Sequence, residues 1–175
     1  MVRAGDVEQK LDPAVLAMLG DVTGRRILYA GDRPGRVGLL LTTRGADVIL
    51  LAPPGVPVAD GAPVIRAGLG EVQFQPVYDA VLADLVLGTV EDWETALRTA
   101  VRALKPGGQL VFSVEHPLDF TGGWDEYDEV RPDGDGYHRP FSTYLNAVIA
   151  AGCRIDAVAE PGFLVVSAYR TDRKV

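Results

Sequence analysis

The segment YDAVLADLVLGTVEDWETALRTAVRALKPGGQLVFSVEHP, residues 78–117, carries the clearest structural pattern in the sequence. It begins with the apolar run Tyr78–Ala83, which is typical of a strand buried on both faces of a parallel sheet. Residues Glu91–Leu104 repeat apolar side chains at three- and four-residue spacing, which predicts an amphipathic helix. The turn Lys105–Gly108 ends this helix, and a second apolar run, Gln109–Val114, follows it. The order strand, helix, strand predicts one unit of a parallel sheet.

The same alternation continues on both sides of this segment. Apolar runs predict further strands, and apolar periodicity bounded by proline or glycine predicts further helices. The last two strands are joined by so short a turn that they should pair antiparallel. We therefore predict an α/β, Rossmann-like fold with a mostly parallel sheet, helices on its faces and an antiparallel last strand. The expected helices are 13–19, 35–44 and 142–151, and the expected strands are 26–30, 47–51, 154–158 and 163–170.

Three stretches depart from this alternation. Residues 52–76 are rich in proline and glycine where a crossover helix would be expected, so we predict that this helix is missing. Residues 119–139 are rich in Asp, Glu, Gly and aromatic side chains, and we interpret them as a lid-like loop. Residues 1–12 are polar and are expected to form a loose N-terminal arm. The whole chain, 1–175, is interpreted as a single domain.

Composition excludes several classes of function. The chain has 175 residues and a formal net charge of −7, which repels phosphate backbones and anionic lipid, so we expect neither nucleic acid nor membrane as a partner. No signal peptide or membrane-spanning run is recognised, so a cytoplasmic location is expected. The single cysteine, Cys153, excludes an internal disulfide, and two distant histidines do not make a metal site.

Several local stretches resemble class I S-adenosylmethionine-dependent methyltransferases, in particular the branch that acts on small molecules. The resemblance covers roughly residues 20–170, and its longest part is the segment quoted first, which is similar to the family's fourth strand, the following helix and the fifth strand. It implies a class I methyltransferase fold with a seven-stranded sheet. The other similar stretches are TGRRILYAGDRPGRVGLLL (23–41), GADVILLAPPG (45–55) and YHRPFSTYLNAVIAAGCRI (137–155).

The resemblance implies S-adenosylmethionine as a cofactor, bound at the glycine-rich loop after the first strand. Gly31, Asp32 and Gly35 are the cofactor-binding candidates, because glycines let the backbone approach a ligand and a helix N-terminus favours a carboxylate. Arg33 stands where the family has its middle glycine, and its long side chain would crowd the cofactor.

Two further positions lack the side chains that the family uses. Tyr29 stands at the place of the first-strand carboxylate, and Ala52 at the place of the acid that accepts hydrogen bonds from the ribose. Each lost hydrogen bond to a carboxylate is worth about 1.5–3 kcal/mol. We therefore predict a degenerate site that binds S-adenosylmethionine weakly or not at all.

The methyl-acceptor side keeps more of its polar side chains. Candidate residues follow the fifth strand, where open α/β sheets place their ligands, and precede the late helix. The histidines titrate near neutral pH without perturbation, so each is a candidate acid or base. The alternative is that they are ordinary strand-end and loop residues. The predicted catalytic residues are His116 and His138, and the predicted substrate pocket consists of Glu115, Trp124, Tyr137 and Arg139.

Three functions remain open from the sequence. The first is a methyltransferase-like protein that binds a small molecule or converts it without the cofactor, as an isomerase or cyclase would. The second is an active small-molecule methyltransferase with an atypical cofactor site. The third is a non-catalytic subunit in a homodimer or hetero-complex, which a large exposed apolar patch would favour.

Overall fold

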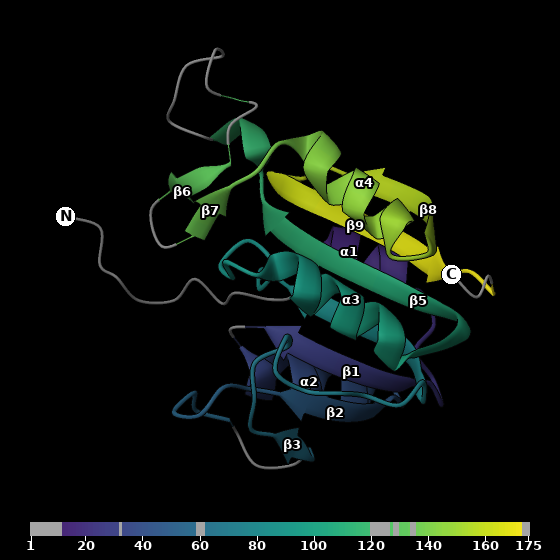
Figure 1. The fold of residues 1–175 in the computed structure, drawn as a ribbon. Coiled ribbons are helices and arrows are strands. Elements are labelled where there is room, and N and C mark those ends of the chain that lie inside the picture. The colour runs from purple at the N-terminus through teal and green to yellow at the C-terminus, as the bar shows by residue number, and fades with distance from the viewer. Residues whose placement is uncertain are drawn as a thin grey trace.

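A seven-stranded sheet forms the centre of the protein, seen in a computed structural model that describes residues 12–31, 33–58, 62–119, 127, 130–133 and 136–172 (Figure 1). The strand order is β3-β2-β1-β4-β5-β9-β8. Strands β1 to β5 pair parallel, and β9 runs antiparallel to both of its neighbours, which confirms the predicted topology. The strands are β1 (Arg26–Gly31), β2 (Asp47–Leu51), β3 (Val64–Ile65), β4 (Tyr78–Asp84), β5 (Leu104–Glu115), β8 (Cys153–Ala159) and β9 (Phe163–Arg170).

Among the described residues, four α-helices cover the two faces of this sheet. Figure 1 shows α3 and α4 in front of it and α1 and α2 behind it. Local sequence explains their ends: Asp12 caps α1 by accepting a 2.7 Å hydrogen bond from the Ala14 N–H, and Gly20, at φ 66°, ends the helix. The helices are α1 (Pro13–Leu19), α2 (Pro34–Thr43), α3 (Trp93–Ala103) and α4 (Phe141–Ala150).

The core is divided by the sheet into two layers. Side chains of alternate residues along each strand point to opposite faces, as a strand requires. In β1, Leu28 packs with the α3 and α4 layer, whereas Ile27 and Tyr29 pack with the α1 and α2 layer. All three are fully buried, so the continuous apolar run reflects a strand covered on both faces.

Two elements differ from the prediction, and the absence of a crossover helix from the described residues agrees with it. Strand β5 already begins at Leu104, and the stretch expected to be a turn belongs to it, with Gly107 at φ 73° and an irregular register. Between β2 and β4 the described residues 52–58 and 62–77 contain no helix, as their proline and glycine content predicts. Within 119–139, β6 (Arg131–Asp133) and β7 (Gly136–His138) form a hairpin that the sequence did not predict. The expected arm lies almost wholly outside the described residues, and the single-domain interpretation stays an expectation.

Candidate functional site

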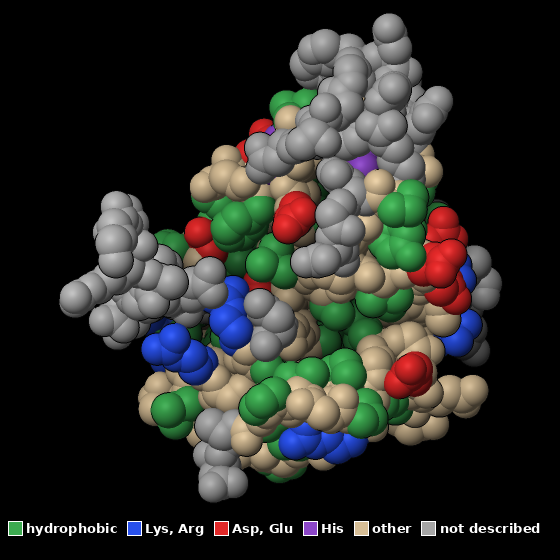
Figure 2. Space-filling model, turned by 90° about the vertical axis from the view of Figure 1, so that its left-hand side faces the viewer, with side chains coloured by type: hydrophobic (Ala, Val, Ile, Leu, Met, Phe, Trp, Pro, Cys, Tyr) green, Lys and Arg blue, Asp and Glu red, His purple; other side chains and the backbone are tan. Residues whose placement is uncertain are grey.

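The carboxyl ends of β1, β4 and β5 bring three residues side by side. Parallel pairing places Gly31 opposite Asp84, and Asp84 opposite Ser113. Figure 2 faces this edge of the sheet, where acidic and basic side chains lie among hydrophobic ones. Ligands of open α/β sheets bind at this edge, so these residues define the candidate site.

Asp84 is the centre of a buried polar network. Its side chain is almost fully covered, with the residue 3% exposed. Ser113 Oγ donates a 2.7 Å hydrogen bond to Asp84 Oδ1, and Tyr29 Oη donates a 3.3 Å hydrogen bond to Oδ2. Arg33 Nη2 lies 3.8 Å from the same Oδ2. A carboxylate, two hydroxyls and a guanidinium from four segments of the chain thus meet beneath the glycine-rich loop.

Tyr29 and Gly31 fit each other closely. The Tyr29 side chain is 0% exposed. A Cβ at Gly31 would lie 2.7 Å from Tyr29 Cζ and 3.0 Å from the Asp84 carbonyl oxygen, so only glycine fits there without displacement. The glycine that resembles the first of the family's loop therefore accommodates the tyrosine ring of its own strand.

The other positions singled out from the sequence lie in the glycine-rich loop, at the start of α2 and after β2. Arg33 precedes α2 at the N-cap position but makes no side-chain capping hydrogen bond. Gly35 lies in the first turn of α2 and is partly exposed. Ala52 is 0% exposed, and its backbone N–H donates a 3.0 Å hydrogen bond to the Ile65 carbonyl. Asp32 lies outside the described residues.

Leu85, the residue after Asp84 in the chain, has a strained backbone conformation. Leu85 is the only described non-glycine residue with positive φ, at 57°, a conformation that side chains with a Cβ rarely adopt. Its N–H lies 3.0 Å from Ser113 Oγ and 3.1 Å from the Ser113 carbonyl. Such residues persist where surrounding contacts hold them, and they are often found at functional sites.

Arg139, predicted to line a substrate pocket, is buried, at 2% exposure. Its guanidinium donates to the carbonyls of the loop between β4 and α3, and its Nε is buried without a hydrogen-bond partner. It also stacks 5.3 Å from the Trp93 ring centroid and 4.8 Å from that of Tyr137. The three carbonyl contacts are to Leu87 at 3.4 Å, Val90 at 2.8 Å and Glu91 at 3.3 Å.

The β6–β7 hairpin is fastened to the same loop. The Tyr137 N–H donates a 2.9 Å hydrogen bond to the Gly88 carbonyl. His138 is 5% exposed, and its Nε2 lies 2.8 Å from the Tyr127 carbonyl oxygen. Tyr137 and Arg139 thus both contact the β4–α3 loop, whereas His138 contacts Tyr127. The predicted pocket residue Trp124 lies outside the described residues.

His116 is held at the end of β5 by a partner that the sequence did not indicate. Its Nδ1 accepts a 3.1 Å hydrogen bond from the Leu118 N–H, so the ring proton lies on Nε2. Nε2 is 2.9 Å from Glu160 Oε1, in the turn between β8 and β9. The neighbouring Glu115 is exposed. This imidazole, oriented by a carboxylate, could accept or donate a proton at the edge of the site.

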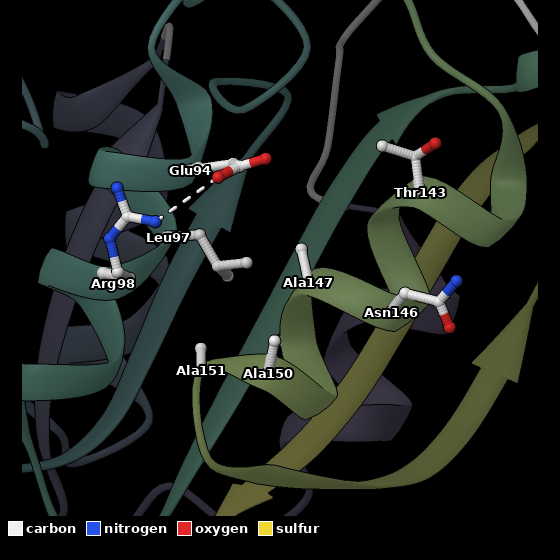
Figure 3. A pocket seen from close by; sticks show the side chains of 8 residues that line it. All are labelled: Glu94, Leu97, Arg98, Thr143, Asn146, Ala147, Ala150 and Ala151. Atoms are coloured by element: carbon white, nitrogen blue, oxygen red, sulfur yellow. Dashed lines mark hydrogen bonds and ion pairs between the residues drawn. The ribbon is translucent and has the colours of Figure 1, made fainter. Parts of the chain in front are cut away.

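A groove of about 350 Å³ lies away from this edge, between α3 and α4 (Figure 3). Small side chains on α4 create it, and it contains one ion pair, Glu94–Arg98, at 3.4 Å. No predicted site residue lines it, so we attribute it to imperfect helix packing. Its lining residues are Glu94, Leu97, Arg98, Thr143, Asn146, Ala147, Ala150 and Ala151.

Other reactive groups do not contribute to a site. Burial raises the pKa of the Cys153 thiol to about 11, so the thiol stays protonated and unreactive at neutral pH. Within the described part of the chain, no group of three His, Cys, Asp or Glu side chains is arranged to hold a metal ion. The helices in that part are also too short or too polar to cross a membrane.

Comparison with known proteins shows similarity to methyltransferases. A family described as a methyltransferase domain matches residues 51–112. An S-adenosylmethionine-dependent methyltransferase from Mesorhizobium loti is 29% identical, with a TM-score of 0.79 over 90% of this chain and 96% of that chain. The chain therefore has the class I methyltransferase fold, and its central part is similar to a methyltransferase domain. No curated protein sequence matches it.

Two more distant structures share the class I methyltransferase fold. One is the Burkholderia thailandensis 1,6-didemethyltoxoflavin-N1-methyltransferase, at 18% identity and a TM-score of 0.65, covering 86% of this chain and 72% of that chain. The other is the [4+2]-cyclase SpnF, at 15% identity and a TM-score of 0.65, covering 85% of this chain and 75% of that chain. At these identities the likeness concerns the fold alone.

The sequence alone did not point to Asp84, the residue at the centre of this candidate site. Tyr29, Gly31 and Arg33 were all singled out, and the structure brings them to Asp84, which was not. A signal was available, because Asp84 is the charged residue that ends the buried run Tyr78–Ala83. His116 and His138 make separate contacts, with Glu160 and Tyr127.

Proposed function

We propose that this class I methyltransferase-like protein has lost productive binding of S-adenosylmethionine and acts on a small molecule without it. The observation that carries the proposal is the buried Tyr29 beneath Gly31, with its hydroxyl on Asp84. In the resembling enzymes this strand position supplies a carboxylate to the cationic end of the cofactor. Here the tyrosine fills the space, and its hydroxyl is already engaged within the protein.

The second strand supports the same proposal. Ala52 is fully buried and offers no side-chain oxygen to a ribose hydroxyl. Two lost hydrogen bonds to carboxylates together amount to about 3–6 kcal/mol, which corresponds to a loss of roughly 10²- to 10⁴-fold in affinity. The residues present therefore do not fit the cofactor in the manner of the family.

The other half of the edge supports action on a small molecule. His116 is oriented by Glu160, and His138 is held in the hairpin that contacts the β4–α3 loop. These contacts support the proposal that the two imidazoles hold or move a proton for a ligand at this edge. The [4+2]-cyclase SpnF has the same fold, so the fold itself is compatible with the proposed reaction.

One observation favours a second candidate, an active small-molecule methyltransferase with an atypical site. Asp84 places a carboxylate oxygen 3.3 Å from the Tyr29 hydroxyl, so the charge that is missing from β1 is present on the neighbouring strand. In that case Asp84 would substitute for the first-strand acid. The third possibility, a non-catalytic subunit of a homodimer or hetero-complex, stays a prediction.

Isothermal titration of the protein with S-adenosylmethionine and S-adenosylhomocysteine separates these functions. We expect dissociation constants weaker than about 100 μM, because the two carboxylate contacts are missing. The variant Ala52→Asp restores the ribose acid and should bind at least about tenfold more tightly, provided that its thermal unfolding shows a folded protein. Micromolar binding by the unmodified chain would contradict the proposal and favour the atypical methyltransferase.

A further inference from the structure

Arg139 is a buried cation whose charge no carboxylate balances within the described residues. The residue is 2% exposed, and the ion pairs in the described part of the chain join other side chains. A guanidinium taken out of water is strongly disfavoured unless an anion and hydrogen-bond acceptors compensate its charge. Arg139 thus brings a positive charge into the interior without a counter-ion from the described residues.

The hydrogen-bond donors of Arg139 are only partly used. A guanidinium carries five N–H donors. The Val90 carbonyl accepts from Nη2 at 2.8 Å, whereas the carbonyls of Leu87 and Glu91 lie at 3.4 and 3.3 Å. Nε is buried and has no hydrogen-bond partner, which is rare for a buried donor and costs free energy. The Nε–H is therefore available to an acceptor that the described residues do not supply.

The acids nearest to this region in the sequence have other roles. Glu91 gives Arg139 only its backbone carbonyl, and its side chain is exposed. Asp92 caps α3 with its carboxylate. Glu94 pairs with Arg98 at 3.4 Å on the side of α3 that faces the groove (Figure 3). The beginning of α3 therefore does not supply the missing counter-ion.

Aromatic rings surround the guanidinium. Its carbon lies 5.3 Å from the Trp93 ring centroid and 4.8 Å from that of Tyr137, and the Tyr144 ring is 5.0 Å from Trp93. Burial raises the pKa of Tyr144, whereas Arg139 lowers it and Glu115 raises it further, so the hydroxyl lies near both side chains. Glu115 ends β5 and is exposed. The cluster around Arg139 therefore borders the carboxyl edge of the sheet.

The segments in contact with Arg139 are peripheral to the sheet. They are the β4–α3 loop and the β6–β7 hairpin, which the 2.9 Å hydrogen bond from the Tyr137 N–H to the Gly88 carbonyl connects. Gly88 and Tyr137 are half-buried, and Thr89 is exposed. Loops and short hairpins open at a lower free-energy cost than paired core strands. A ligand can therefore reach the guanidinium without disturbing the central sheet.

We infer that Arg139 recognises a carboxylate on the small-molecule ligand, with Nε–H as the free donor and the rings of Trp93, Tyr137 and Tyr144 beside it. One guanidinium balances one negative charge, so a monoanion fits, whereas a dianionic phosphate would leave excess charge buried. The aromatic surroundings favour a carboxylate on a flat, apolar ligand. The inference rests on the proposed function in taking the ligand to be a small molecule bound at the carboxyl edge.

The experiment offers the protein a flat carboxylate and its neutral counterpart. Thermal unfolding is followed with increasing sodium benzoate, and in parallel with benzamide, at an ionic strength held constant with sodium chloride. We expect benzoate to raise the Tm saturably, by about 3–5 °C at tenfold excess over its dissociation constant. Benzamide should shift the Tm by less than about 1 °C, because it has the same shape without the charge.

Two variants locate the response. Arg139→Met, where its unfolding is cooperative, should shift by less than about 1 °C with benzoate, because charge and donor are both gone. Arg98→Met removes an equal charge from an exposed position on α3 and should keep the full response.

A second measurement needs no substitution at position 139, in case Arg139→Met fails to fold. In ¹⁵N NMR of the unmodified chain, the Arg139 Nε–H signal is identified by its contacts with the ring protons of Trp93 and Tyr137. This signal should move with benzoate and stay in place with benzamide.

Several outcomes would overturn the inference. They are an absent response at tens of millimolar benzoate, an equal response to benzamide, a response that survives Arg139→Met, or an Nε–H signal that benzoate does not move. None of these depends on S-adenosylmethionine. Micromolar binding of that cofactor would overturn the proposed function, while the benzoate response alone would still decide whether Arg139 recognises a carboxylate.

Discussion

Buried polar groups have different bonding partners at the two edges of the central sheet. At the amino edge, Gln109 is 2% exposed and its Nε2 donates to the Met18 carbonyl at 2.6 Å, which ties α1 to the sheet. There Asp79 receives a 2.8 Å hydrogen bond from Lys105 Nζ in half-exposed surroundings. At the carboxyl edge, the buried Asp84 is surrounded by side chains that mainly hold one another.

At the amino edge a buried polar group holds elements of the fold together. At the carboxyl edge the buried polar groups join strands that are already paired, and they are a cost to stability. The amide of Gln109 connects two elements, and removing it would loosen both. The Asp84 network instead adds a desolvated charge, an ion pair and a strained residue to strands that are already paired. Such features reduce stability, and proteins retain them chiefly where a ligand or a reaction uses them. Arg139 lies between these cases, because it fastens a loop at the functional edge.

The largest effect is expected from Arg139→Met, which tests how strongly the acceptor half of the carboxyl edge is built. The substitution leaves the carbonyls of Leu87, Val90 and Glu91 without their buried donor. We expect the free energy of unfolding to fall by about 2–3 kcal/mol, measured by urea denaturation. Arg98→Met, which breaks only an exposed ion pair, should cost less than about 0.5 kcal/mol. A loss below about 1 kcal/mol for Arg139→Met would mean that this edge tolerates an unfastened loop.

An intermediate loss in the free energy of unfolding is expected from Gly31→Ala. This substitution tests how closely position 31 packs against Tyr29 and Asp84. Its new Cβ would meet the Tyr29 ring and the Asp84 carbonyl, and overpacking of this kind costs about 2 kcal/mol. Gly88→Ala is the matched control, since its Cβ meets Val114 at an ordinary 3.9 Å and should be nearly neutral. In a Tyr29→Leu background the cost of Gly31→Ala should shrink, because the ring is gone. Equal costs in both backgrounds would show that the ring does not restrict position 31.

The smallest effect is expected at the amino edge, from Asp79→Asn. The hydrogen bond from Lys105, together with that from the Arg26 N–H, lowers the pKa of the Asp79 carboxyl. A carboxyl whose pKa is lower in the folded state contributes stability above its unfolded pKa of about 3.9, and loses it as the pH falls through the folded pKa. We expect the variant to be less stable by about 0.5 kcal/mol at pH 7, and the difference to vanish near pH 2. Urea denaturation at both pH values measures it, and a gap that persists in acid would point to packing rather than charge.

Most of the fold could be predicted because its signals are local. The apolar runs, the spacing of the helices, and stops such as Gly20 and Gly152 depend only on neighbouring residues. The missing helix between β2 and β4 follows from proline and glycine in the same way. The β6–β7 hairpin was not predicted, because its two strands are short and polar and are held by contacts such as Tyr137 with Gly88.

The candidate site could be predicted only in part. Tyr29, Gly31 and Arg33 stand in a recognisable loop, so the sequence marked them as atypical for the family. Their common partner Asp84 was missed, because an acid at the end of an apolar run does not reveal which neighbouring strands flank it. His116 was marked as a strand-end residue, but its partner Glu160 was not.

The sequence by itself determined the order of the elements, the class I methyltransferase resemblance and the absence of acids at positions 29 and 52. Only the tertiary structure decided which side chains lie around position 29 in place of an acid. Parallel pairing aligned the ends of β1, β4 and β5, and the strand register turned Tyr29, Asp84 and Ser113 toward the same face. Residues far apart in the chain were thereby placed within hydrogen-bond distance, and local patterns carry no information about such distances.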